Sequence, residues 1–102
     1  MITIQEKALK YAKKVRGCFL IKTISNSIGC WNGETKKVTN LKVEILKYFN
    51  REYYEDYDEY EYQGIKVYIL NSLILSENVH ISILLKLPFM KPKFSVSGIA
   101  IQ

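Results

Sequence analysis

The chain has 102 residues, of which 48% are hydrophobic and 25% charged, and these fractions exclude a disordered or fibrous protein. A chain of this length buries too little surface to be divided further, so we expect a single domain over residues 1–102. No apolar run approaches the roughly 20 residues of a membrane span, no export signal opens the chain, and there are only two cysteines. We therefore expect a cytoplasmic protein without a membrane partner.

The net charge of +5 conceals an uneven distribution along the chain. Six of the ten acidic residues fall between positions 52 and 61, a stretch without Lys or Arg, and the other residues carry a net charge of +11 (15 cations, four acids). A basic surface of this size attracts acidic partners or nucleic acid. Because the lysines are scattered and the only arginines are Arg16 and Arg51, a solvated lysine surface is the favoured interpretation.

The first predicted element is an amphipathic helix. Apolar side chains recur at helical spacing and form one stripe: Ile4, Ala8, Tyr11, Ala12 and Val15. Thr3 and Glu6 fit a capping box at its start, and Gly17 is a residue at which a helix ends easily.

Three segments follow the helix and read as strand, loop and strand. Residues 18–24 are apolar on both faces and rich in strand formers, which predicts a central strand covered on two sides. Residues 25–33 have the polar and glycine content of a loop and contain Cys30 and the only tryptophan, Trp31. Residues 41–46 alternate as a strand does, with a short helix as the alternative.

A hairpin is predicted in the middle of the chain. Residues 52–62 mix acids with tyrosines, Gln63 and Gly64 supply a turn, and residues 65–69 alternate in the returning strand. The apolar face of that strand consists of Ile65, Val67 and Ile69.

The last third of the chain predicts two more strands. One has a single apolar face made of Val79, Ile81, Ile83, Leu85 and Leu87, and residues 94–101 form the other. Pro88 and Pro92 bracket a loop between them. One helix followed by about five to six strands predicts an α+β fold, with the N-terminal helix packed on a mainly antiparallel or mixed sheet.

These elements and their order resemble the HesB-like domain, the fold of A-type iron–sulfur carriers. The resemblance rests on residues 1–4 leading into the helix, the loop 28–33 around Cys30, the hairpin 62–68 and the closing segment 94–99. It implies a HesB-like α+β fold and a role near iron–sulfur or thiol metabolism. Cys30 would then be the ligand of a metal or an iron–sulfur cluster, and Cys18 would be a further cofactor ligand.

Two departures from that family bear on the cluster. A-type carriers have a Cys-Gly-Cys pair near the C-terminus, where this chain has Ser95, Ser97 and Gly98, and the branch that the sequence resembles has a second thiol or selenol where Trp31 stands. One thiolate holds an iron–sulfur cluster poorly, because such clusters usually need four cysteine ligands. A homodimer that shares Cys30, with Cys18 if it reaches, would supply at most four.

The other reactive side chains favour structural roles. Cys18 lies in an apolar strand, where a free cysteine behaves as a small hydrophobe, and the spacing of the two cysteines is not that of a zinc site. His80 lies between Val79 and Ile81, on the face opposite to the apolar row, which predicts a solvated histidine.

Two classes of function stay open from the sequence, and neither is an enzyme, because no hydrolase or nucleotide-binding motif occurs. The first is the iron–sulfur or thiol role of Cys30 in a dimer; a separate, less favoured option is a thiol redox role, which requires a low thiolate pKa at Cys30. The second is a metal-free protein-interaction or self-association module, in which the basic helix and the acidic hairpin dock a partner or a second copy. Nucleic acid is not a favoured partner, since acids interleave the tyrosines and repel phosphate.

Overall fold

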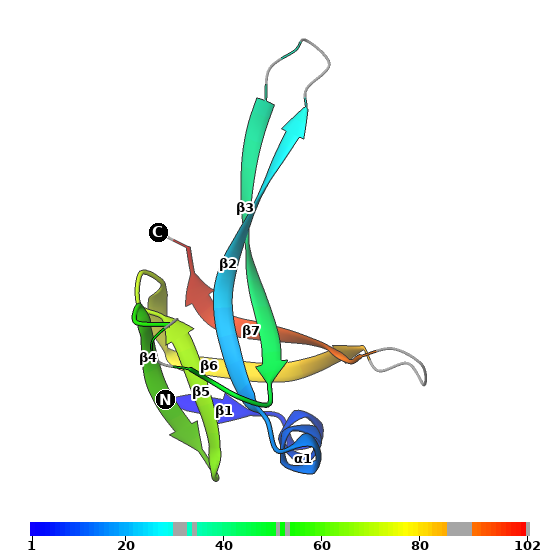
Figure 1. The fold of residues 1–102 in the computed structure, drawn as a ribbon. Coiled ribbons are helices and arrows are strands. Elements are labelled where there is room, and N and C mark those ends of the chain that lie inside the picture. The colour runs from blue at the N-terminus through cyan, green and yellow to red at the C-terminus, as the bar shows by residue number, and fades with distance from the viewer. Residues whose placement is uncertain (30–32, 34, 51, 53, 86–90, 102) are drawn as a thin grey trace.

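The computed structural model describes residues 1–29, 33, 35–50, 52, 54–85 and 91–101, and in this part of the chain it has one helix and seven strands (Figure 1). In chain order they are β1 (Ile2–Ile4), α1 (Glu6–Val15), β2 (Cys18–Gly29), β3 (Thr35–Leu46), β4 (Tyr57–Tyr62), β5 (Ile65–Leu70), β6 (Ile74–Leu85) and β7 (Lys93–Ala100). A three-stranded sheet has the order β1-β6-β7, and a four-stranded sheet has the order β3-β2-β5-β4. The described helix is too short and too polar to cross a membrane.

The predicted α+β class, a helix on one sheet of about five to six strands, is wrong, because the protein is mainly β and its strands divide into two sheets. Both sheets are mixed: β1 pairs in parallel with β6 and β2 in parallel with β5, whereas the other pairs are antiparallel. Two segments account for much of the difference. Residues 2–4, predicted as the approach to a helix, form a strand, and residues 25–29, predicted as a loop, continue β2.

The helix α1 is confirmed, but its ends differ from the prediction. Of the predicted apolar stripe, Ala8 and Ala12 are buried and Tyr11 and Val15 are half-buried, whereas Ile4 belongs to β1. Leu9, which the prediction left out, is also buried. Gln5 stands at the N-cap without a side-chain cap, so no capping box forms, and Arg16 rather than Gly17 adopts the left-handed conformation at the C-cap. The helix therefore depends on its buried face rather than on side-chain capping.

The strand β2 is confirmed as a central strand with apolar side chains on both faces. Phe19 and Ile21 are fully buried in the main core between the sheets, whereas Leu20 is fully buried on the outer face of the four-stranded sheet. There it pairs in register with Tyr68 of β5, whose exposed fraction is 6%. This strand therefore joins two apolar layers.

An aromatic cluster covers that outer face. Phe49, in the connection from β3 to β4, stacks on Tyr68 with 3.6 Å between ring centroids and on Tyr54 with 5.0 Å. Tyr54 in turn makes an edge-on contact with Tyr57. The connection thus closes over the sheet with ring contacts, a geometry that aromatic side chains favour.

The β4–β5 hairpin is confirmed. Gln63 and Gly64 in its two-residue turn both have positive φ, as a type I′ turn requires, and the predicted apolar face of Ile65, Val67 and Ile69 is buried.

The three-stranded sheet also follows its predicted alternation. Val79 and Ile81 of β6 are buried, and His80 between them is exposed. In β7, Gly98 has φ +85°, and a side chain there would overlap the Asn78 carbonyl, so the closing strand requires glycine. The strands predicted at 79–87 and 94–101 thus form β6 and β7; Leu87 and Pro88 lie outside the described residues.

The main core lies between the two sheets and α1, with contributions from β1, α1, β2, β5 and β6. At one side of this sandwich β1 lies beside β4, and at the other β3 lies beside β7. Figure 1 shows the far half of the β2–β3 hairpin rising away from the rest of the protein. Two regions are therefore open to solvent. One is the far half of that hairpin, and the other is the corner of the sandwich between β3 and β7.

Candidate functional site

The two cysteines do not form a described site. Cys30 and Trp31 lie outside the described residues, so the cofactor and metal roles predicted for Cys30 stay predictions. Cys18 is a half-buried free thiol at the start of β2, and burial raises its pKa. The 12 residues of β2 separate Cys18 from Gly29 by about 36 Å along the strand. The described residues contain no group of three or more His, Cys, Asp or Glu that could hold a metal ion.

His80 is confirmed as a solvated residue of the outer face. Its Nδ1 lies 2.8 Å from the Thr3 hydroxyl oxygen of the neighbouring strand β1. By strand alternation Cys18 shares the outer face of the other sheet with Leu20. The two side chains therefore lie on opposite faces of the sandwich, and a Cys18–His80 pair does not form.

Tyrosines and acids alternate in β4 and lie in different environments. Tyr60 and Tyr62 pack against the main core, whereas the carboxylates at 58, 59 and 61 are exposed. Glu59 accepts a hydrogen bond of 3.0 Å from the Tyr68 hydroxyl and lies 3.5 Å from the Lys66 ammonium. The tyrosines of this strand thus help to build the sandwich, and its acids supply an anionic surface.

Tyr57 at the start of β4 keeps its phenol proton at neutral pH. Its pKa is raised above the ordinary value mainly by burial. Smaller contributions come from the charges of Tyr54, Glu44 and Asp56. Tyr57 therefore adds no negative charge to the acids that flank it.

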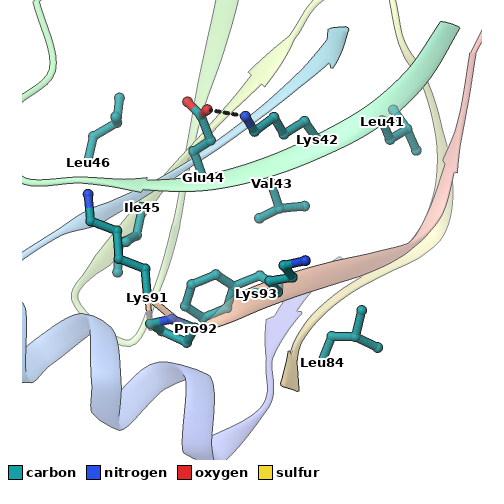
Figure 2. A pocket seen from close by; sticks show the side chains of 11 residues that line it. Leu41, Lys42, Val43, Glu44, Ile45, Leu46, Leu84, Lys91, Pro92 and Lys93 are labelled. Atoms are coloured by element: carbon teal, nitrogen blue, oxygen red, sulfur yellow. Dashed lines mark ion pairs between the residues drawn. The ribbon is translucent and has the colours of Figure 1, made fainter. Parts of the chain in front are cut away.

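An open groove with a volume of about 690 Å³ lies between β3 and β7. We call it the β3–β7 groove; it is lined by residues 41–46 of β3, by Leu84 of β6 and by residues 91–94 at the start of β7. Figure 2 shows Val43 and Ile45 on the groove side of β3 and Lys42 and Glu44 on the other side. The groove thus has an apolar wall supplied by the alternation of one strand.

The opposite wall is held rigidly by the core. Phe94 contacts Phe19 edge-on with 5.1 Å between ring centroids and meets Tyr11 of α1 at 5.9 Å. At the rim, Leu84 is 67% exposed, so most of its apolar side chain is open to solvent. An apolar partner would bury Leu84 without any rearrangement of the core.

The charges around the groove are not balanced. Glu44, the only acid of the described lining, forms ion pairs with Lys42 (3.1 Å) and Lys22 (3.2 Å). Partial burial acts to raise the pKa of Glu44, but the two ammonium groups outweigh it and hold the pKa below its usual value. Lys91 and Lys93 lie on the groove side and have no ion-pair partner among the described residues (Figure 2).

Sequence reasoning missed this groove because its walls come from distant parts of the chain. The sequence predicts a strand without a further role at residues 41–46, and only a loop between two prolines at residues 89–91. The available signal was the run Lys91, Pro92, Lys93 and Phe94, which places two cations around an apolar anchor.

Comparison of the chain with family models, with curated proteins and with solved structures found no match. The resemblance to HesB-like domains therefore stays a prediction from the residues quoted for it.

Proposed function

We propose that the protein is a metal-free protein-interaction module whose β3–β7 groove binds an acidic polypeptide segment that also carries apolar side chains. The observation that carries the proposal is the pair of ammonium groups, Lys91 and Lys93, beside apolar walls with no described acid turned toward them. Glu44 does not neutralise them, since it is already bonded to two other lysines.

The apolar walls supply the attraction that does not depend on charge. Val43 and Ile45 are half-buried, and Leu84 is mostly exposed. Burial of such side chains contributes roughly 25 cal/mol per Å² of apolar surface removed from water, before the entropy costs of association. In the opposite wall Phe94 is held by its ring contact with Phe19, so a partner would meet a surface that is already formed.

An extended polypeptide fits the groove better than an enclosed small molecule does. The groove is open, and both β3 and β7 are the last strands of their sheets in the described part of the chain. Edge strands present backbone N–H and C=O groups, to which an extended segment adds as a further strand while its alternate side chains enter pockets. Acidic side chains on the segment would then meet Lys91 and Lys93.

A labelled random copolymer of glutamate and tyrosine is a suitable probe, with fluorescence anisotropy as the measurement. We expect it to bind the wild-type protein, to bind more weakly as salt rises, and to lose about tenfold or more in affinity for Lys91→Glu/Lys93→Glu. Polyglutamate of equal length should bind less well, because it lacks aromatic groups for the apolar walls.

The matched control is Lys36→Glu/Lys37→Glu, which makes the same change of charge on exposed lysines of β3 outside the groove. This variant should retain most of the affinity for the copolymer. Equal losses in the two double variants would show that the copolymer binds the basic surface in general, and the proposed function would then be wrong.

A further inference from the structure

We infer that the segment bound by the β3–β7 groove is the acidic segment of a second copy of this chain, residues 54–61, so that two copies associate through groove and acidic segment. The inference rests on the proposed function and names its partner. It begins from the separation of charge along the chain: six acids between positions 52 and 61, and a net charge of +11 elsewhere.

The acidic segment offers free carboxylates. Glu55, Asp56, Asp58 and Glu61 are exposed, and none has an ion-pair partner among the described residues, whereas Glu59 is paired with Lys66. These carboxylates therefore resemble Lys91 and Lys93 of the groove, because neither set has a described partner of opposite charge.

The acidic segment also carries the aromatic groups that the groove needs. Tyr54 and Tyr57 of this segment are half-buried, so part of each residue stays open to solvent, whereas Tyr60 packs against the core of its own molecule. The stack of Phe49 on Tyr54 and Tyr68 holds the beginning of the segment in place. Docking would thus require little ordering of the chain, which is a main cost of association.

The sheet order prevents the groove and the acidic segment from meeting within one molecule. In the order β3-β2-β5-β4 the groove adjoins β3, whereas Asp58, Glu59 and Glu61 of the acidic segment belong to β4, at the opposite edge of the sheet. Three strand spacings separate these edges, about 14 Å, and the buried strands β2 and β5 lie between them. Only another molecule can bring the acidic segment into the groove.

A two-fold arrangement uses both surfaces of both copies. Each molecule has one groove and one acidic segment, so a dimer in which each groove receives the partner's segment is closed, with both pairs of surfaces covered. The attraction is electrostatic in part and should weaken as the screening length falls with salt.

Light scattering coupled to gel filtration tests the inference with charge reversal on either surface. We expect the wild-type chain to dimerise at low salt, and both Lys91→Glu/Lys93→Glu and Asp58→Lys/Glu61→Lys to weaken dimerisation by about tenfold or more. An equimolar mixture of the two variants should recover a dimer, because each reversed surface then faces a partner of opposite charge. The control variant Lys36→Glu/Lys37→Glu should dimerise as the wild type does.

The outcomes separate this inference from the proposed function. A wild-type chain that stays monomeric at low salt, or a mixture that fails to recover the dimer, overturns the inference. If the glutamate–tyrosine copolymer still binds through Lys91 and Lys93 in that case, the groove takes a different acidic partner and the proposed function stands. If the copolymer also fails to bind there, both are wrong. Circular dichroism of each variant confirms that the fold is intact.

Discussion

At both edges of the four-stranded sheet inward-facing and outward-facing side chains alternate, but one corner of the sandwich is closed and the other is open. At the β4 edge, Tyr60 and Tyr62 turn inward against the core beside β1, and the remaining side chains give the edge its acids. At the β3 edge, Val43 and Ile45 also turn inward, but a groove stays open between them and β7. Large aromatic rings close one corner of the sandwich and smaller aliphatic side chains leave the other open. The size of the inward residues, rather than the strand pattern, accounts for which corner stays open.

The largest expected effect lies beneath both edges, at Phe19. Phe19→Ala should lower the free energy of unfolding by about 3–5 kcal/mol, because it leaves a cavity in the main core and removes the support of Phe94. Urea denaturation measures this loss. Leu84→Ser, the matched change at the exposed rim of the groove, should leave stability nearly unchanged and weaken copolymer binding. A large loss of stability in Leu84→Ser would show that the groove belongs to the core.

The next effect belongs to the β4 edge. Tyr68→Phe removes the hydroxyl that donates a 3.0 Å hydrogen bond to Glu59 and should cost about 1 kcal/mol of unfolding free energy. The ring stays, so its stacking with Phe49 is kept. Chemical denaturation at neutral pH measures the change in unfolding free energy. A variant as stable as the wild type would show that the hydrogen bond to Glu59 does not stabilise this edge.

A smaller effect is expected at the β3 edge. Glu44→Gln removes the anion between Lys22 and Lys42, and since the group is near the surface the loss should be below about 1 kcal/mol. The folded pKa of Glu44 is lowered, so its contribution is complete above the ordinary carboxyl pKa and disappears as the pH falls through the folded value. The difference in unfolding free energy between wild type and variant should therefore be present at pH 7 and absent in strong acid. A difference that grows in acid would contradict this sign.

The smallest effect on binding is expected at Cys30, to which the groove proposal assigns no role. Cys30→Ser should bind the glutamate–tyrosine copolymer as the wild type does. The same pair of proteins tests the iron–sulfur hypothesis: after anaerobic reconstitution with iron and sulfide, that hypothesis predicts charge-transfer absorption in the wild type and its loss in Cys30→Ser. If neither protein absorbs in the visible region, the cluster hypothesis fails and the groove proposal is unaffected.

Local chemistry made part of the fold predictable. The turn at Gln63 and Gly64, the amphipathic helix α1 and the two-sided strand at residues 18–24 each follow from neighbouring residues, and the structure confirms them, although Ile4 of the predicted helix stripe lies in β1. The division into two sheets was not predictable in this way. It depends on pairings such as Thr3 with His80, which are 77 positions apart.

The ends of the strands and the groove were missed for a related reason. Ser25, Asn26 and Ser27 have the composition of a loop, yet their backbones continue the ladder with β3, because that ladder depends on peptide groups rather than on side chains. The groove requires residues 41–46 and 91–94 to lie opposite each other. Periodicity identifies each strand separately and contains no information about which strands face one another.

The most direct test of the central claim is hydrogen exchange of the wild-type protein with and without the glutamate–tyrosine copolymer at low salt. We expect slower exchange at the groove strands, residues 41–46 and 93–94, and unchanged exchange in the Lys-rich helix α1 and in the far half of the β2–β3 hairpin. Protection centred on α1, or spread evenly over the basic surface, would contradict it.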